Sequence, residues 1–579
     1  MALRFLAMVL RHPEAASPEP AALAVLQLHR ILNSRHLKIW VSDPASVLVS
    51  EDQRTLILGT LFDRSDQPVR VRKLGLDLIA PADLAPALAR YWGQYLAFSQ
   101  STLGSVRVYR DPGGALPCYV LETASAVYLF SDIDLAARAC GISLELDWSS
   151  LASGLVWNGL RTSRTAFSQI YELQQGNVLA LGGHHYCAQT SFWSPWDHIE
   201  PAVPEGEALA AQLHTIVAGV VTAMAGQFDA IQLCLSGGLD SSIIAALLKD
   251  RKTTCLTLVT DGAEGDERRQ ARLVADHVRL PLVDRRYRME GVDLSKSSAC
   301  HLPRPVGAPA RLAFDRANLD LAEAIGSDAL FTGVGGDNVF CLMQSATPIA
   351  DCVRTSGLGP RAFRAVLDVC RLTGCSVWTA LARARKKLPA RAGPYHWAPD
   401  SRFLSAEIMS ATSPRPAHHW LDPVTDVLPG RAAHVAAIMR PQNFIEGFRR
   451  DAPIEMVTPL LSQPIVELCL SISSWDWIAG GRDRAVARQA FATMLPARTI
   501  TRRSKGGPGS FYRQIVNRNR AFILERLMDG ELVRRGIVDP ASVEAFFKAP
   551  LDSQGDRYVR LLDLCDAEAW IEHARGRSG

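Results

Sequence analysis

Small residues and one acid follow an apolar run in residues 231–242, IQLCLSGGLDSS. Its first five residues predict a buried strand, and its last residues open a helical run. Between them, Gly237 and Gly238 allow close approach of the backbone to a phosphate, and Ser236 offers a hydroxyl donor. The start of a helix also favours bound negative charge. The stretch therefore predicts an anion cradle, beside which Asp240 could hold a magnesium ion.

The loop lacks the lysine that a Walker A loop, GxxxxGK[ST], requires. It resembles instead the SGGxDS loop of the pyrophosphate-loop ATPases, which cleave ATP between its α and β phosphates. The variant SGGLDSS is most similar to the asparagine synthetases within that group. A plain turn before a helix is the alternative, but seven matching positions between a strand and a helix favour a nucleotide site.

A second glycine-rich stretch, FTGVGGDN at residues 331–338, ends another predicted strand. It resembles the second signature of asparagine synthetases, S-G-E-G-S-D-E. In that family the acid at the position of Asp337 joins the loop acid, here Asp240, in holding magnesium, which favours carboxylate oxygens. The alternative is a glycine-rich turn with a helix-capping aspartate. Three glycines would allow the close approach of ATP: Gly333, Gly335 and Gly336.

Two residues of this stretch depart from the family pattern. Val334 stands where asparagine synthetases have a glutamate, and Asn338 where they have a second acid. The resemblance links the missing glutamate to reception of ammonia. Its replacement predicts that the nucleophile is not ammonia.

A third family-like segment comes late, as GRDRAVAR at residues 481–488 and TRRSKGGP at residues 501–508. It resembles the family's helix, Leu-Pro and Arg-x-Lys sequence. Lys505 would then stabilise charge that develops on the α phosphate and on departing pyrophosphate. The alternative is a solvated basic loop. For Arg502 and Arg503 this alternative is as strong as a catalytic role.

The resemblance thus implies a full set of site residues. The ATP-binding set is Leu235, Ser236, Gly237, Gly238, Leu239, Asp240, Ser241, Ser242, Leu258, Gly333, Val334, Gly335, Gly336 and Lys505. The resemblance assigns magnesium binding to Asp240 and Asp337, and it assigns catalysis to these two acids and Lys505. His301 and Arg304 lie in the part of the sequence that corresponds to the family's acceptor pocket, and they could orient a substrate carboxylate. A turn-rich structural loop is an equally strong interpretation of these residues.

The C-terminal part alternates predicted strands with helices, which indicates an α/β fold with a doubly wound parallel sheet and ligands at the carboxyl ends of its strands. Strands are predicted at residues 231–235, 254–260, 282–287 and 328–332, and a helix begins at Asp266. Beyond about residue 345 the sequence predicts mainly helices.

Short β-type runs fill the N-terminal part. YWGQYLAF and VRVYRDPGG, at residues 91–98 and 106–114, resemble class II glutamine amidotransferase domains, as does FSQIYELQQGNVLAL at residues 167–181. The resemblance implies an N-terminal-nucleophile (Ntn) β-sandwich. Working glutaminases of this kind have a cysteine after the initiator methionine, whereas this chain has Ala2 and no cysteine before Cys118. We therefore expect no glutaminase activity.

The length of 579 residues predicts more than one domain. A Pro- and acid-rich stretch at residues 194–207 suggests domains at 1–205 and 206–579. The formal charge of only +4 gives no indication of nucleic-acid binding. No apolar run is expected to span a membrane, and the N-terminus reads as a strand rather than a signal peptide. The 12 cysteines never form CxxC, which favours reduced thiols and a cytoplasmic location.

The resemblance implies a ligase that activates a carboxylate with ATP and Mg²⁺. Without a glutaminase cysteine, the attacking amine is expected to belong to the substrate. The length and the altered second signature resemble the lasso peptide macrocyclases, which implies a core peptide cut from a precursor, a leader peptidase and a leader-recognition protein. The alternatives are a β-lactam synthetase-like or asparagine synthetase-like amide ligase. A silent assembly partner that binds nucleotide or peptide is a further alternative.

Overall fold

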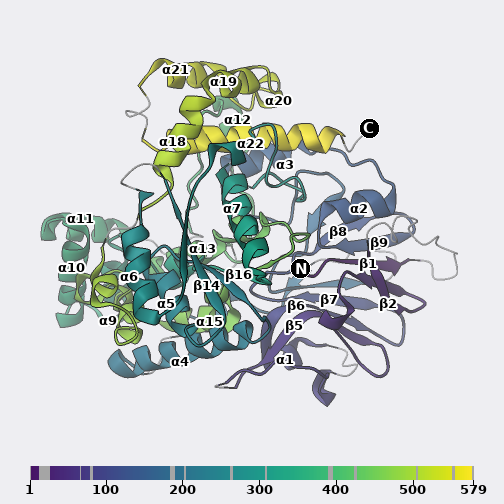
Figure 1. Cartoon of the computed structure of the whole chain (residues 1–579), viewed down its shortest axis with the longest axis horizontal. Coiled ribbons are helices and arrows are strands. Elements are labelled where there is room, and N and C mark those ends of the chain that lie inside the picture. The colour runs from purple at the N-terminus through teal and green to yellow at the C-terminus, as the bar shows by residue number, and fades with distance from the viewer. Residues whose placement is uncertain are drawn as a thin grey trace.

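The computed structural model describes residues 2–11, 27–65, 67–78, 83–182, 189–200, 204–260, 265–306, 310–388, 395–422, 427–503, 506–550 and 555–576. Two antiparallel sheets of six strands make up the N-terminal part, and a parallel sheet of five strands lies at the centre of the remainder (Figure 1). This arrangement confirms the predicted α/β class, with an antiparallel sandwich before a parallel sheet.

The two antiparallel sheets pack face to face. The first has the order β10 (Ile170–Glu172), β8 (Tyr119–Glu122), β9 (Ala126–Phe130), β1 (Phe5–Leu10), β3 (Leu37–Val41) and β2 (His29–Asn33). The second has the order β12 (Gln189–Ser191), β11 (Asn177–Leu181), β7 (Val106–Arg110), β6 (Tyr91–Gln100), β5 (Thr55–Asp63) and β4 (Val47–Val49). Alternate residues of β1 face opposite ways, so Phe5 joins the core between the sheets while Leu6 joins a core shared with helices.

The parallel sheet has the order β15 (Leu282–Arg286), β14 (Thr253–Val259), β13 (Ile231–Cys234), β16 (Ala329–Phe331) and β17 (Glu455–Val457). Its first four strands are those predicted. Helices cover both faces: Phe331 packs in a core with α4 (Gly206–Ala225) and α5 (Leu239–Leu247), and Leu330 packs near Ala322 of α7 (Ala310–Ile325). The fifth strand, β17, lies in a region where the sequence predicted mainly helices.

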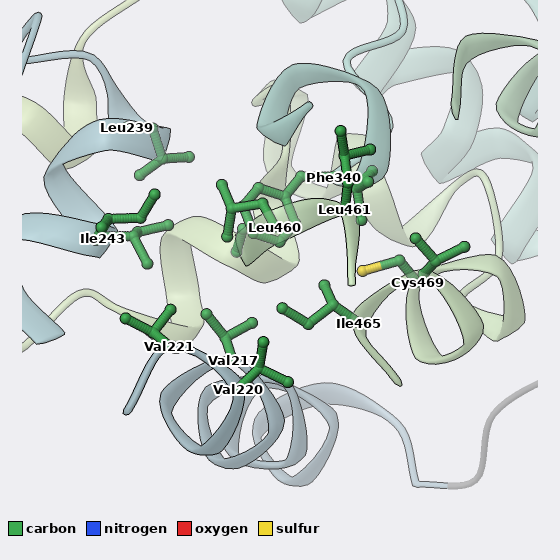
Figure 2. Close-up of a cluster of buried hydrophobic side chains, with 14 of the residues drawn as sticks. Val217, Val220, Val221, Leu239, Ile243, Phe340, Leu460, Leu461, Ile465 and Cys469 are labelled. Carbon is green, nitrogen blue, oxygen red and sulfur yellow. The ribbon is translucent and has the colours of Figure 1, made fainter. Parts of the chain in front are cut away.

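The helix α4 packs along the core beneath the nucleotide loop helix. Figure 2 shows Val217 and Val221 of α4 opposite Leu239 and Ile243 of α5, with Leu460 near them. By length and composition α4 would be able to cross a membrane, contrary to the sequence expectation, although 44% of that apolar window is buried in the protein. The pair α10 (Pro360–Thr373) and α11 (Val377–Lys387) passes the same test only as one span bent by 113°.

Other helices surround these sheets. They are α1 (Ala85–Leu88), α2 (Ile133–Cys140), α3 (Trp148–Val156), α6 (Arg268–Val278), α8 (Gly336–Val339), α9 (Thr347–Ser356), α12 (Ala406–Ala411), α13 (Pro429–Met439), α14 (Gln442–Glu446), α15 (Gln463–Ser471), α16 (Ala485–Ala490), α17 (Ala497–Thr501), α18 (Gly509–Arg518), α19 (Arg520–Met528), α20 (Glu531–Arg534), α21 (Pro540–Lys548) and α22 (Arg557–Gly576). The last helix, yellow in Figure 1, shares a hydrophobic core with α3 of the N-terminal part. Helix α4 begins at Gly206, next to the predicted domain boundary, which itself stays a prediction.

Candidate nucleotide site

A cavity of about 410 Å³ lies where the carboxyl ends of β13, β14 and β16 meet. The loop after β13 and the glycine-rich stretch after β16 form part of its wall. Three aromatic side chains from other elements complete the wall: Tyr287, Phe314 and Phe444. Ligands of open parallel sheets bind at this edge, so the cavity is the place where the sequence motifs predict a nucleotide.

Hydrogen bonds within the loop after β13 fix its conformation. Ser236 Oγ lies 3.2 Å from Ser241 Oγ and accepts a hydrogen bond from the backbone N–H of Gly238. Gly237 has a φ of +68°, and a Cβ there would lie 2.4 Å from the backbone of Gln270 in α6. Only glycine fits this position without displacing α6. The loop therefore presents backbone and hydroxyl donors at the start of α5, as an anion cradle requires.

Two glycines of the second motif bring it against the start of α5. A Cβ on Gly333 would lie 2.7 Å from the backbone nitrogen of Ser241, and one on Gly336 would lie 2.4 Å from Cγ of Asp240. Both contacts are closer than side chains tolerate, so larger residues would push the two motifs apart. The glycines of the second motif thus bring Asp337 close to Asp240.

The two acids share one guanidinium. Arg484 Nη1 lies 3.2 Å from each carboxylate oxygen of Asp240 and 2.5 Å from one oxygen of Asp337. Asp483 accepts a hydrogen bond from the Nε of the same side chain. Burial lowers the pKa of Arg484, but the three carboxylates outweigh it and leave the pKa raised. Two carboxylates that converge on one cation fit the donor set of a magnesium ion.

Sequence reasoning missed Arg484 as an individual residue, although it lies in the quoted segment GRDRAVAR. Its backbone adopts a left-handed conformation with φ of +53° immediately before α16, and this turn directs it to residues 244 and 147 positions away. Nothing in the local pattern signals such a contact. Among the residues described, no group of three or more His, Cys, Asp or Glu side chains could hold a metal, so magnesium would depend on the two acids together with phosphate and water oxygens.

The segment that carries Lys505 is anchored beside the cavity on both sides. Arg502 donates to Glu267 at 2.6 Å and to the carbonyl of Gly237 at 3.3 Å, and the N–H of Gly506 donates to Glu267 at 2.8 Å. Gly506, Gly507 and Pro508 line the cavity. Lys505 itself lies outside the described residues. Its role stays a prediction, and Arg502 has a structural contact of its own.

Most of the predicted ATP-binding residues line this cavity: Leu235, Ser236, Gly238, Asp240, Ser241, Leu258, Gly333, Val334 and Gly335. Four others do not. Leu239 is buried in the hydrophobic core, and Ser242 donates to the carbonyl of Gly238. Gly237 lies against the backbone of Gln270, and Gly336 lies against the side chain of Asp240. These four residues lie outside the cavity wall and support the residues that line it.

The structure separates His301 and Arg304 from the nucleotide cavity. His301 is buried, its Nε2 lies 2.9 Å from the carbonyl oxygen of Glu446, and burial lowers its pKa. Arg304 donates to Glu172 at 2.8 Å and lines a different cavity. Neither residue lines the nucleotide cavity, and a substrate role for them stays a prediction.

Comparison with known proteins identifies the C-terminal part. A sequence model of the asparagine synthase family matches residues 221–572. No curated protein matches the chain. Similar solved structures include a glutamine phosphoribosylpyrophosphate amidotransferase from B. subtilis complexed with ADP and GMP (9% identity, 48% of this chain, 59% of that chain, TM-score 0.20). Another is described as the allosteric regulatory enzyme of purine biosynthesis (8% identity, 49% of this chain, 75% of that chain, TM-score 0.20).

The present chain spans about three fifths of the length of that amidotransferase, and both structural similarities are too low to support an argument. The family match is different, because it covers more than half of the chain and contains both acids, the phosphate loop and the Lys505 segment. The chain therefore belongs to the asparagine synthase family, whose shared domain is that of an ATP-dependent amide ligase.

Proposed function

We propose that this protein is a lasso peptide cyclase. It would activate an Asp or Glu side-chain carboxylate of a leaderless core peptide with ATP and join it to the peptide's N-terminal α-amine. The observation that carries the proposal is the convergence of Asp240 and Asp337 beside the SGGLDSS loop. The same chain has Ala2 in place of the glutaminase cysteine and Val334 in place of the glutamate linked to ammonia.

In the first step, the peptide carboxylate attacks the α phosphorus of ATP and pyrophosphate leaves, which gives an acyl-adenylate. The backbone donors of the loop and the hydroxyl of Ser236 would bind the leaving pyrophosphate. Asp240 and Asp337 would hold a magnesium ion, which supplies charge neutralisation on the phosphate oxygens. Lys505 would stabilise the negative charge that develops during the transfer.

In the second step, a neutral amine attacks the acyl carbon, AMP departs and an amide forms. Two substitutions favour an amine on the substrate. Ala2 is a buried methyl where a glutaminase needs a thiol, so no ammonia would be generated. Val334 lines the cavity with an apolar side chain where a glutamate would receive ammonia. An amine already in the same molecule as the activated carboxylate needs neither residue and gains from proximity.

This function implies other components in a cytoplasmic setting. The substrate would be a core peptide released from its precursor by a leader peptidase together with a leader-recognition protein. No disulfide joins the ten cysteines whose side chains the structure describes, which fits a reducing compartment.

The test is to incubate the protein with ATP, Mg²⁺ and a synthetic leaderless peptide that has a free N-terminus and one internal acid. We expect mass spectrometry to find a product lighter by one water, together with AMP. The same peptide with an acetylated N-terminus, or with Asn replacing the acid, should remain linear. Formation of ADP, or water loss from the acetylated peptide, would exclude the proposed reaction.

ATP–pyrophosphate exchange separates the alternatives. A silent nucleotide-binding partner would show no exchange with any carboxylate. Exchange with a small β-amino acid but with no peptide would indicate a β-lactam synthetase-like enzyme instead.

A further inference from the structure

Helices α10 and α11 lie at the outer edge of the molecule. Figure 1 shows them on the side away from the N-terminal sheets. Ala380 and Ala384 of α11 pack in a small core with residues of α9 and α10, so one side of α11 faces the protein. The remaining sides of α11 face outward.

Large apolar side chains are concentrated on the surface of this pair of helices. Among the residues described, ten large apolar side chains are exposed, and five of them lie within residues 358–381. These five are Leu358, Phe363, Val377, Trp378 and Leu381. Single exposed apolar residues are common on protein surfaces, but a concentration of them marks an interaction surface. Trp378 is 80% exposed, so it projects from the helix and packs little against its own chain.

Apolar and basic residues occupy different sides of α11. Val377 and Leu381 lie one turn apart on one exposed strip, and Trp378 adjoins it. Arg383 and Lys387 lie one turn apart on another exposed strip. Apolar side chains on one side and Lys or Arg on the other are typical of helices that lie at a membrane surface.

The positive charge of the chain is also concentrated here. Residues 352–388 contain eight Arg or Lys and one Asp, a net charge of +7, whereas the whole chain carries only +4. Five exposed members of this group have no ion pair with any of the residues described: Arg364, Arg383, Arg385, Lys386 and Lys387. The projection is therefore attracted to a negatively charged surface.

We propose that α10 and α11 dock the protein on an anionic lipid bilayer. Trp378 and Leu381 would lie at the level of the headgroups, where tryptophan is favoured, and the basic residues of α11 would contact lipid phosphates. The bend of 113° between the two helices prevents the pair from crossing a bilayer as one straight span, but it allows both to lie at the surface.

A bilayer fits these residues better than an acidic protein does. Lysine is depleted at protein–protein interfaces, whereas each Lys or Arg near an anionic bilayer raises the affinity by about fivefold. An apolar side chain that projects from a helix also needs no complementary pocket in a fluid bilayer. The proposal does not depend on the reaction proposed above.

The experiment is co-sedimentation of the full-length protein with lipid vesicles. We expect binding to vesicles of equal parts phosphatidylglycerol and phosphatidylcholine, none to phosphatidylcholine alone, and weaker binding as potassium chloride is added. Hydrogen–deuterium exchange should show protection of residues 377–388 on the anionic vesicles. Absence of binding, or protection confined to other residues, would overturn the proposal.

Two variants at exposed positions test the surface itself. Lys386→Gln/Lys387→Gln should weaken vesicle binding by roughly tenfold or more, and Trp378→Ala should weaken it by about tenfold through loss of apolar contact. Lys249→Gln/Lys252→Gln, at exposed lysines beyond α5, and Leu103→Ala, at an exposed leucine of the N-terminal part, are the matched controls. All four proteins should unfold at the wild-type temperature. Equal binding by the Lys386→Gln/Lys387→Gln protein and its control would overturn the docking surface.

Immobilised poly-glutamate is the probe for the competing partner. Retention of the wild type on poly-glutamate without binding to anionic vesicles, and loss of that retention in Lys386→Gln/Lys387→Gln, would assign the surface to an acidic protein and overturn the proposal of a bilayer.

Discussion

The Nη1 atom of Arg484 lies 3.2 Å from both carboxylate oxygens of Asp240, a residue 244 positions earlier in the chain. Asp240 is 4% exposed and Arg484 8% exposed, so this ion pair is removed from water. The same nitrogen contacts Asp337, and the arginine thus neutralises two acids that would otherwise repel each other. A magnesium ion between these acids would take over part of that neutralisation.

Replacement of Arg484 tests this relationship. In buffer with EDTA, Arg484→Gln should lower the free energy of unfolding by about 3–5 kcal/mol, because it leaves buried carboxylates without their partner. Adding Mg²⁺ should restore part of the loss, which urea unfolding followed by tryptophan fluorescence would measure. Arg482→Gln, at an exposed neighbour, should be neutral in both buffers. A loss in Arg484→Gln that Mg²⁺ does not reduce would argue against a metal site at these acids.

The second prediction concerns catalysis by the acids. Asp337→Asn keeps the size of the side chain and its contact with Arg484 but removes the charge a magnesium ion needs. We expect ATP–pyrophosphate exchange to fall by roughly 10²-fold or more, as for loss of a preorganised electrostatic group. Asp293→Asn, in an exposed pair with Lys296, is the control and should exchange at the wild-type rate. Normal exchange by Asp337→Asn would remove this residue from the site.

The site could be predicted from sequence where its chemistry is local. The strand β13, the glycine loop and α5 are consecutive in the chain, and their pattern predicts both the fold and the anion cradle. Arg484 could not be predicted, because its role depends on a left-handed turn and on contacts across the domain. The strand β17 was missed because three residues, EMV, carry too little periodicity to distinguish a strand from a helix.

Leu239 illustrates a residue for which motif and structure disagree. It lies within SGGLDSS, yet its side chain packs in the core beside Ile243 and Leu460 (Figure 2). Leu239→Ala should therefore lower the free energy of unfolding by about 2–5 kcal/mol. Leu239→Met, which conserves volume, should lose less than about 1.5 kcal/mol and keep its affinity for nucleotide. Nucleotide affinity lost in the Met variant at unchanged stability would instead place the side chain in the binding site.

The buried carboxylate of Glu446 predicts a pH dependence. Burial alone would raise its pKa, but Arg161 and Arg110 outweigh burial and lower the pKa from 4.5 to about 2. A lowered pKa means that the ionised form stabilises the fold at pH values above 4.5, and that this stability is lost as the pH falls towards 2. The free-energy difference between wild type and Glu446→Gln should stay constant from about pH 7 to about pH 5 and then shrink.

Urea unfolding at each pH would measure this difference, which we expect to be about 3–5 kcal/mol at neutral pH because Arg161 and Arg110 lose a buried partner. Glu544→Gln, in an exposed pair with Lys548, is the control and should show no such difference. A difference that grows as the pH falls would contradict a lowered pKa for the Glu446 carboxylate.

The last prediction concerns Lys505, whose flanking residues Arg502 and Gly506 both bind Glu267 beside the nucleotide cavity. If this lysine stabilises charge on the departing pyrophosphate, Lys505→Ala should lower kcat by roughly 10²-fold or more with little change in KM for ATP, because the interaction strengthens only in the transition state. Lys505→Arg keeps the charge and should recover part of the rate. Arg503→Ala is the matched control, since it removes a neighbouring basic residue. Equal effects of Lys505→Ala and Arg503→Ala would indicate a general basic surface rather than a catalytic lysine.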